Sequence, residues 1–303
     1  MSARADRVPW TNPPGCIPPR MRRKSLPRAP GKTAFTLAVA VTLSACDFTR
    51  PPDPFEAHPD VVTIALLLVA GESEARLLAV HPHRPRDGDA PKITATLKGP
   101  GWTAAFSEEL ELESCTNSAS WPGPVRCLGA TLPEQIGAIG DYTLEGTAPL
   151  GSFRGAMNMP APPDLLEPED DLELPAPARG TGVEIPVKYR TGSDVGTLMA
   201  DVTDAFETLD DGTEVEINRH HLGPFPRTLE GAEADTVYVF YNANPVRFRL
   251  SLLGIGRHYT NFLAHIGTFP TPKPWPSFGI EGEGVYGYFD GLTRSPAVQV
   301  RIR

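Results

Sequence analysis

The sequence predicts a mainly β protein with two β-sandwich-like domains and one or two short helices in the second domain. Stretches of alternating polar and apolar residues, such as KITATLK at 92–98, are typical of half-buried strands. Gly and Pro account for 28 and 34 of the 303 residues, which is high for a helical protein. Seven or so short strands in roughly 100 residues are typical of a sandwich.

The order of these patterns divides the chain into five parts. We expect a signal peptide at 1–45, a Pro-rich tether at 46–60, a β-sandwich domain at 61–160, an acidic Pro-rich linker at 161–182 and a second β-rich domain at 183–303. Strands are expected at 61–70, 76–81, 92–98, 102–106, 110–115, 126–132, 142–146 and 152–159, and in the second domain at 183–189, 213–218, 236–241, 246–253, 285–289 and 297–302.

The linker at 161–182 interleaves prolines with carboxylates, so it cannot pair in a central sheet and should be exposed. Its carboxylates lack the spacing and the turn glycine of a hand-type calcium loop, which is the alternative interpretation. Helices are expected in the second domain. One is predicted at 198–209, where Leu198, Val202, Ala205, Phe206 and Leu209 follow one another at helical spacing. The segment at 257–266 is either a second helix or an irregular crossover.

The N-terminus has the pattern of a secretory signal peptide. A segment rich in Arg and Pro precedes the uncharged apolar run TAFTLAVAVTL at 33–43. The 13 residues from Thr33 to Ala45 fall short of the roughly 20 that a membrane-spanning helix needs. Translation from Met1 or from Met21 gives the same mature chain.

The run ends in Leu43-Ser44-Ala45-Cys46, which resembles the lipobox of bacterial lipoproteins. The resemblance implies cleavage before Cys46, a thioether from its thiol to diacylglycerol, and acylation of the new amino terminus. Several acyl chains anchor a protein stably. The expected location is therefore the cell envelope, with the outer membrane favoured over the inner and the face left open. The alternative is a soluble secreted protein with a coincidental cysteine.

The charge balance excludes some classes of partner. Eight of the 28 basic residues but only one of the 37 acidic residues precede Cys46, so 20 and 36 remain after cleavage and the net charge is -16. Such a surface does not suit nucleic acid or anionic lipid headgroups. The expected membrane contact is therefore made by the lipid anchor.

Four cysteines are present. Cys16 lies in the leader and Cys46 is the predicted anchor, so Cys115 and Cys127 remain in the folded region. An even pair in an exported chain predicts a disulfide. A zinc site is the sharper alternative, but two cysteines without a nearby His do not form a zinc ligand set.

The sequence predicts no enzyme activity, metal or cofactor. Gly71-Glu72-Ser73-Glu74-Ala75 approaches a nucleophile elbow, but Ala replaces the last Gly and the segment lies between two expected strands, so a hairpin tip is favoured. His81 and His83 are separated by Pro82, which does not favour a continuous strand. His220 and His221 would face opposite ways on a strand.

Aromatic residues near the C-terminus are the candidate ligand-binding residues. Trp275, Phe278, Tyr286 and Tyr288 recur among prolines and glycines, and exposed aromatics of this kind stack on sugars or peptides. The alternative is that they cover the bottom of the second domain.

The segments FRLSLLGIGRHYTNFLAHI (248–266) and IEGEGVYGYFDG (280–291), together with the lipobox, resemble a family of uncharacterised bacterial lipoproteins with a domain of unknown function. Members are often encoded beside TonB-dependent outer-membrane receptors. The Asn expected before the glycines is absent, with Gly279-Ile280 in its place. The resemblance implies an Ig-like or transthyretin-like first sandwich, a second β domain and no known catalytic residues.

The resulting functional hypothesis is a lipid-anchored, non-enzymatic accessory or interaction module linked to outer-membrane nutrient uptake, with a TonB-dependent receptor as the expected partner. The alternatives are a glycan- or peptide-binding module that uses the C-terminal aromatics and a secreted hydrolase.

Overall fold

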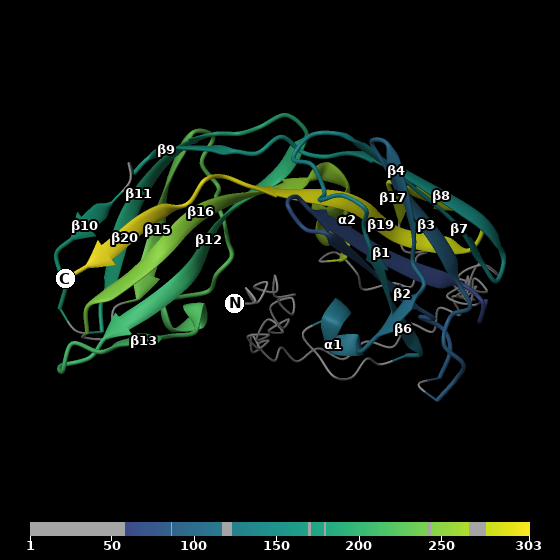
Figure 1. Cartoon of the computed structure of the whole chain (residues 1–303), viewed down its shortest axis with the longest axis horizontal. Coiled ribbons are helices and arrows are strands. Elements are labelled where there is room, and N and C mark those ends of the chain that lie inside the picture. The colour runs from purple at the N-terminus through teal and green to yellow at the C-terminus, as the bar shows by residue number, and fades with distance from the viewer. Residues whose placement is uncertain are drawn as a thin grey trace, which may run out of the picture.

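The computed structural model describes residues 58–85, 87–116, 123–168, 171–178, 180–240, 244–266 and 277–303. This part of the chain is mainly β, which confirms the predicted fold class. Three sheets build two lobes, and Figure 1 shows the molecule as an arch with a lobe at each end. Within the described residues no helix is long and apolar enough to cross a membrane.

The chain forms most of the first lobe, then most of the second, returns to the first and ends in the second. In order they are β1 (Val62–Val69), β2 (Glu74–Val80), β3 (Thr94–Gly99), β4 (Trp102–Ala105), β5 (Glu108–Leu110), α1 (Leu112–Cys115), β6 (Val125–Thr131), β7 (Asp141–Ala148), β8 (Gly151–Asn158), β9 (Asp164–Glu167), β10 (Leu172–Leu174), β11 (Gly182–Arg190), β12 (Val195–Thr208), β13 (Glu214–Glu216), the 3-10 turn η1 (Arg219–His221), β14 (Arg227–Thr228), β15 (Ala234–Phe240), β16 (Val246–Gly256), α2 (Arg257–Ile266), β17 (Ser277–Phe278), β18 (Ile280–Gly282), β19 (Val285–Arg294) and β20 (Val298–Ile302).

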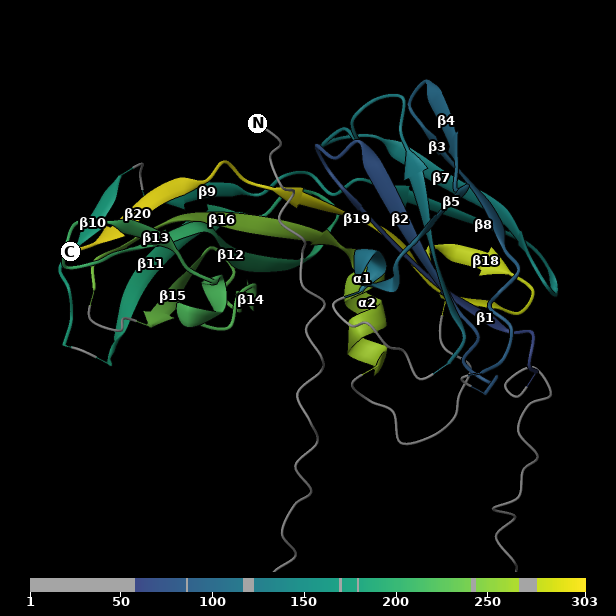
Figure 2. The same cartoon turned by 60° about the horizontal axis from the view of Figure 1, so that its bottom comes forward.

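A long sheet connects the two lobes. Its strand order is β10-β20-β16-β19-β1-β2-β6-β5, with β12 paired to β16 along most of its length. The first lobe adds a five-stranded sheet, β18-β8-β7-β3-β4, and the second adds a three-stranded sheet, β15-β11-β9. Both lobes are therefore two-layered, and Figure 2 shows the long sheet passing from one to the other.

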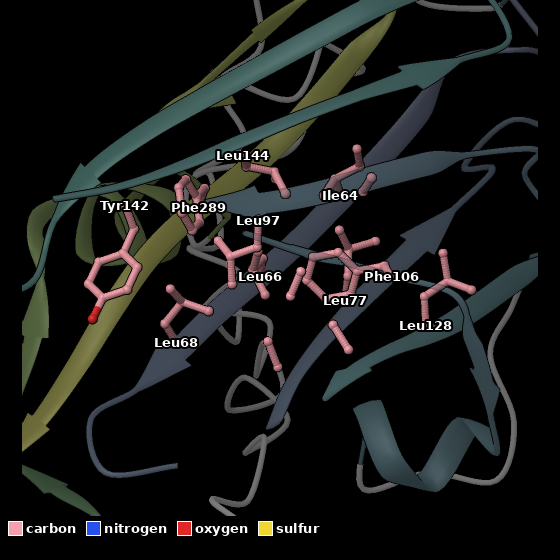
Figure 3. Packing of buried hydrophobic residues seen from close by; sticks show 14 of the residues in the cluster. Ile64, Leu66, Leu68, Leu77, Leu97, Phe106, Leu128, Tyr142, Leu144 and Phe289 are labelled. Atoms are coloured by element: carbon pink, nitrogen blue, oxygen red, sulfur yellow. The ribbon is translucent and has the colours of Figure 1, made fainter. Parts of the chain in front are cut away.

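The first core lies between the long sheet and the five-stranded sheet. Apolar residues at every second position of β1 point into it, as period-two alternation requires. Figure 3 shows the packing, in which Ile64, Leu66 and Leu68 of β1 meet Leu97 of β3 and Phe289 of β19. The second core is formed in the same way by β12, β16 and β20 against β11 and β15.

The first lobe contains a tyrosine corner. The backbone N–H of Gly137 donates to the hydroxyl oxygen of Tyr142 near the start of β7, at 2.8 Å. A tyrosine bonded to backbone a few residues upstream is a feature of immunoglobulin-type sandwiches. The ring of Tyr142 is buried against Trp102, with 6.1 Å between the ring centroids.

The C-terminal segment departs from the expected domain boundaries. β19 was expected in a separate second domain, but it pairs in parallel with β1, from Val62–Val285 to Val69–Leu292. Ile280, Val285 and Phe289 therefore belong to the first core. Parallel strands need a distant connection, so the division at 161–182 into two sequential domains does not describe the structure.

The segment at 161–182 also differs from a free linker. It contains β9, which pairs with β11, and β10, which pairs with β20. Both strands lie at the ends of their sheets. Prolines and carboxylates are tolerated there because one edge of the strand needs no partner.

Two secondary-structure predictions were wrong. Residues 195–208 form the long strand β12 rather than a helix, while α2 at 257–266 is confirmed. Residues 110–115, predicted as a strand, contain the end of β5 and the short helix α1, so the first lobe also carries a helix.

Candidate binding surface

The predicted site residues divide into those that the structure describes and those that it does not. Cys46 and Trp275 lie outside the described residues. Cys115 at the end of α1 and Cys127 in β6 form the disulfide that the sequence predicted. Both cysteines are buried in a small apolar cluster with Leu78 and Val80. The disulfide therefore fastens α1 to the face of the long sheet that is opposite the first core.

The C-terminal aromatics that the structure describes are buried or half-buried. Tyr288 is fully buried, and the rings of Tyr259 and Phe262 from α2 pack against it with centroids 4.8 Å away. Burial raises the pKa of Tyr288 well above its usual value and raises the pKa of Tyr259 to about 12. Phe278 and Tyr286 are half-buried. Tyr288 therefore attaches α2 to the long sheet and is not available to a ligand.

Asp290 holds the start of α2. Its carboxylate accepts hydrogen bonds from the backbone N–H groups of Tyr259, at 2.7 Å, and of Gly291, at 2.8 Å. A carboxylate near a helix N-terminus satisfies unpaired N–H groups and interacts favourably with the helix dipole. Burial nevertheless raises the pKa of Asp290, because desolvation outweighs these hydrogen bonds. His258 lies beside it, but its Nδ1 bonds the Phe289 carbonyl at 3.0 Å.

A second buried carboxylate joins the two lobes. Asp201 of β12 accepts from Arg219 of η1 at 2.8 Å and pairs with Arg294, the last residue of β19, at 3.1 Å. Arg294 also donates to the hydroxyl of Ser251 at 3.1 Å. The ion pair places a second-lobe strand next to the end of a first-lobe strand, which is a structural role.

The histidines do not converge on a metal or catalytic site. Among the described residues no group of three or more His, Cys, Asp and Glu could hold a metal ion. His81 is buried with its Nδ1 2.9 Å from the Val61 carbonyl, and burial lowers its pKa. His220 and His221 lie exposed in η1. Gly71 and its neighbours connect β1 and β2, as expected for a hairpin tip.

Exposed apolar side chains identify a different surface. The large apolar residues that are strongly exposed in the described part of the chain are Ile139, Leu166, Leu209, Val215, Tyr238, Phe240 and Leu263. Tyr238 and Phe240 are adjacent on one face of β15, with 45% and 56% of their surface exposed. We call this surface, with the residues of β11 beside it, the β15 face.

The β15 face combines two rings with polar neighbours. Register places Gly182 of β11 opposite Phe240, and Glu184 opposite Tyr238. The guanidinium carbon of Arg227 lies 5.1 Å from the centroid of the Tyr238 ring, within cation–π range. Phe240 therefore has no side chain opposite it on β11, whereas the Tyr238 ring is held in place by Arg227.

The sequence carried a signal for this surface. The segment TVYVFY was predicted as a strand, and both of its faces are apolar or aromatic. Val237 and Val239 are completely buried, so Tyr238 and Phe240 must point the other way. β15 belongs to an outer layer of the second lobe, so one of its faces packs on no core. Only the arrangement of the sheets shows this, and the local sequence does not.

Comparisons with known proteins add little. No family model and no curated protein matches the chain. Solved structures with some similarity include the titin domains Z1Z2 in complex with telethonin (12% identity over 80% of this chain and 94% of that one, TM-score 0.18). Tandem Ig repeats of Dlar (11%, 80% and 98%, TM-score 0.27) and the N-terminal Ig1-2 module of Drosophila receptor protein tyrosine phosphatase DLAR (11%, 81% and 100%, TM-score 0.26) are also similar. The TM-scores are low, so these matches carry no argument about function.

Proposed function

We propose that the chain is a lipid-anchored, non-enzymatic interaction module of the cell envelope whose binding surface is the β15 face. The lipid anchor is proposed because Cys46 directly follows small residues and a short apolar run. The described fold begins at residue 58, so about a dozen residues separate the anchor from the fold. Three of them, Pro51, Pro52 and Pro54, are prolines, a composition that favours an extended spacer.

The buried groups with shifted pKa values have structural roles, which supports a non-enzymatic function. Asp290 holds a helix start, Tyr288 fills a packed interface and His81 bonds a backbone carbonyl. A hydrolase would need a nucleophile within reach of a base, and the base in turn oriented by a third group. His258 is bonded to a carbonyl instead of the neighbouring carboxylate.

A TonB-dependent receptor remains the proposed protein partner, because members of the resembling lipoprotein family are often encoded beside such receptors. An accessory protein of this kind needs a rigid body and a surface that is not already occupied. The long sheet provides the rigid connection, and the β15 face provides exposed aromatic area.

The anchor is tested by intact mass and detergent partitioning of the protein from its native envelope, with Cys46→Ala as the variant and Cys16→Ala as the matched control. We expect a chain beginning at residue 46 plus acyl groups, unchanged in Cys16→Ala and absent in Cys46→Ala. An unlipidated wild-type protein that partitions into the aqueous phase would falsify the anchor.

The receptor partner is tested by co-purification with the receptor encoded nearest to the gene. The wild type is compared with Tyr238→Ala/Phe240→Ala and with Ile139→Ala, which alters a still more exposed apolar residue of the first lobe. Recovery that depends on the β15 aromatics but not on Ile139 supports the proposed surface. Equal recovery of all three proteins contradicts it.

A further inference from the structure

We propose that the β15 face is a carbohydrate-binding platform for an uncharged polysaccharide. This inference rests on the proposed function for its surface only, and it assigns that surface a polysaccharide in place of the protein receptor. Tyr238 and Phe240 are two positions apart on one strand, so their Cα atoms are about 7 Å apart and both rings leave the same face. Two aromatic rings side by side on a flat, exposed face present apolar planes to the faces of successive sugar rings.

The platform is preorganised. β15 pairs with β11 over seven residue pairs, from Gly182–Phe240 to Lys188–Ala234. Val237 and Val239 anchor the strand in the second core. The Arg227 guanidinium lies against the Tyr238 ring and limits its movement. Tyr238 therefore loses less side-chain freedom on binding, which favours affinity from a small contact area.

The polar groups around the rings suit hydroxyl ligands. Glu184 lies opposite Tyr238 and can accept hydrogen bonds, and Arg227 can donate them. The tyrosine hydroxyl can do both. Rings flanked by both donors and acceptors match a sugar, whose two faces are apolar and whose rim carries hydroxyls.

The charges on this face favour an uncharged polymer. On the same exposed face, next to β9, Lys188 pairs with Glu167 at 2.7 Å and Arg190 pairs with Asp164 at 3.3 Å, so these charges are neutralised within the face. Beside the two rings, the negative charge of Glu184 is balanced by the positive charge of Arg227. The whole chain carries a net charge of -9, which repels polyanions.

A peptide strand added to β15 is disfavoured by the backbone hydrogen bonds. The N–H of Phe240 already donates to the carbonyl of Leu222 at 2.8 Å, so the outer edge of β15 is occupied at this point. Strand addition needs a free edge. The exposed rings, which stand above the sheet rather than at its edge, are therefore the accessible feature.

The experiment is affinity electrophoresis of the purified protein through native gels that contain glycogen, yeast mannan, mixed-linkage β-glucan or xylan, with alginate as the anionic comparison. We expect at least one neutral polymer to slow the wild type and Ile139→Ala equally. The apparent affinity should fall at least tenfold in Tyr238→Ala/Phe240→Ala and little in Tyr238→Phe, which keeps the ring.

Gly182→Gln provides a variant that keeps both aromatics. A Cβ at Gly182 meets only the Val239 carbonyl, at an ordinary 3.7 Å, so the fold tolerates the side chain while it covers the ring of Phe240. Retardation should be lost in this variant without a change in thermal unfolding. The proposal is overturned if no neutral polymer retards the wild type, or if Tyr238→Ala/Phe240→Ala and Gly182→Gln are retarded as strongly as the wild type. It is also overturned if the rings bind a proline-rich peptide and no glycan.

The test separates this inference from the proposed function. Cys46→Ala should retain full retardation, because the platform lies in the second lobe and the anchor does not contribute to it. If glycan is not bound but receptor recovery still depends on Tyr238 and Phe240, the interaction surface stands and the carbohydrate assignment fails.

Discussion

The two lobes share one long sheet but differ in how they are closed. The first lobe takes strands from both ends of the chain, carries the disulfide and has a tyrosine corner. Of the strongly exposed large apolar residues described in the structure, Ile139 belongs to the first lobe and Leu263 to α2, whereas Leu166, Leu209, Val215, Tyr238 and Phe240 belong to the second lobe. The difference indicates that the first lobe is built for stability and the second presents the surface for contact.

The largest expected effect comes from removing the C-terminal strands from the first lobe. A fragment of residues 58–160 lacks β18 and β19, and with them Ile280, Val285 and Phe289 of the first core. We expect it to show no cooperative unfolding transition in urea, followed by circular dichroism. Cooperative unfolding of the fragment would show that the first lobe is an independent domain and would remove the main contrast between the lobes.

Asp201→Ala tests the ionic connection between the lobes. The substitution leaves Arg219 and Arg294 without their shared carboxylate at a position where Asp201 is 1% exposed. Breaking a buried pair by removing one partner costs about 3 kcal/mol or more. Urea denaturation should show this loss, and the exposed pair Lys188–Glu167, altered by Glu167→Ala, is the control with a loss below about 1 kcal/mol. Equal losses would contradict a special role for Asp201.

The disulfide should stabilise the first lobe by an intermediate amount. Cys115 and Cys127 are 12 residues apart, and closing a loop of that size contributes about 3 kcal/mol in the chain-entropy model. Replacing both cysteines with Ala should lower the midpoint of urea unfolding and leave ligand retardation by the β15 face unchanged. A loss of retardation in this variant would show that the two lobes are coupled more closely than their separate cores suggest.

The smallest effect is a pH dependence from Asp290. Its folded-state pKa is raised above the usual 3.8 by burial, so the native state binds the proton more tightly than the unfolded state does. Stability from this group is full below pH 3.8 and is lost as pH rises through the higher folded pKa. Asp290→Asn keeps an oxygen acceptor and removes the titration. The unfolding free energy of the variant should therefore rise relative to that of wild type as pH rises above 3.8, and a difference that stays constant with pH contradicts the assignment.

The strands were largely predictable from the sequence, and β12 shows why one was missed. Leu198 and Val202 point into the second core at even positions, and a β-bulge between Thr203 and Phe206 then changes the alternation. Asp204 in this bulge has a φ of 48°, and Ala205 becomes the next buried residue. The buried residues of this bulged strand are therefore spaced by four and three positions. One face of a short helix has the same spacing, so residue spacing alone cannot distinguish the two.

The pairing of β19 with β1 and the site residues could not be predicted locally. Nothing near Val285 indicates a partner at Val62, although Gly287 is a partial signal in retrospect. A Cβ there would collide with the Ile64 carbonyl, and its φ of 117° suits glycine. Tyr288 was expected on the surface because glycines lie near it in the sequence. In the structure, Gly287 instead lets β19 pack closely against the backbone of β1. The exposed rings of Tyr238 and Phe240 lay in a segment that was assigned only as a strand.

The parallel pairing of β1 and β19 also sets the order in which the protein can fold. Because the chain is synthesised from its N-terminus, β1 is available early and its partner β19 becomes available only near the end. Until then one edge of β1 has unpaired N–H and C=O groups and an unfinished apolar layer, which is an aggregation hazard. Contacts this distant in sequence also slow folding. The first core can therefore be completed only after the last strands of the chain are available.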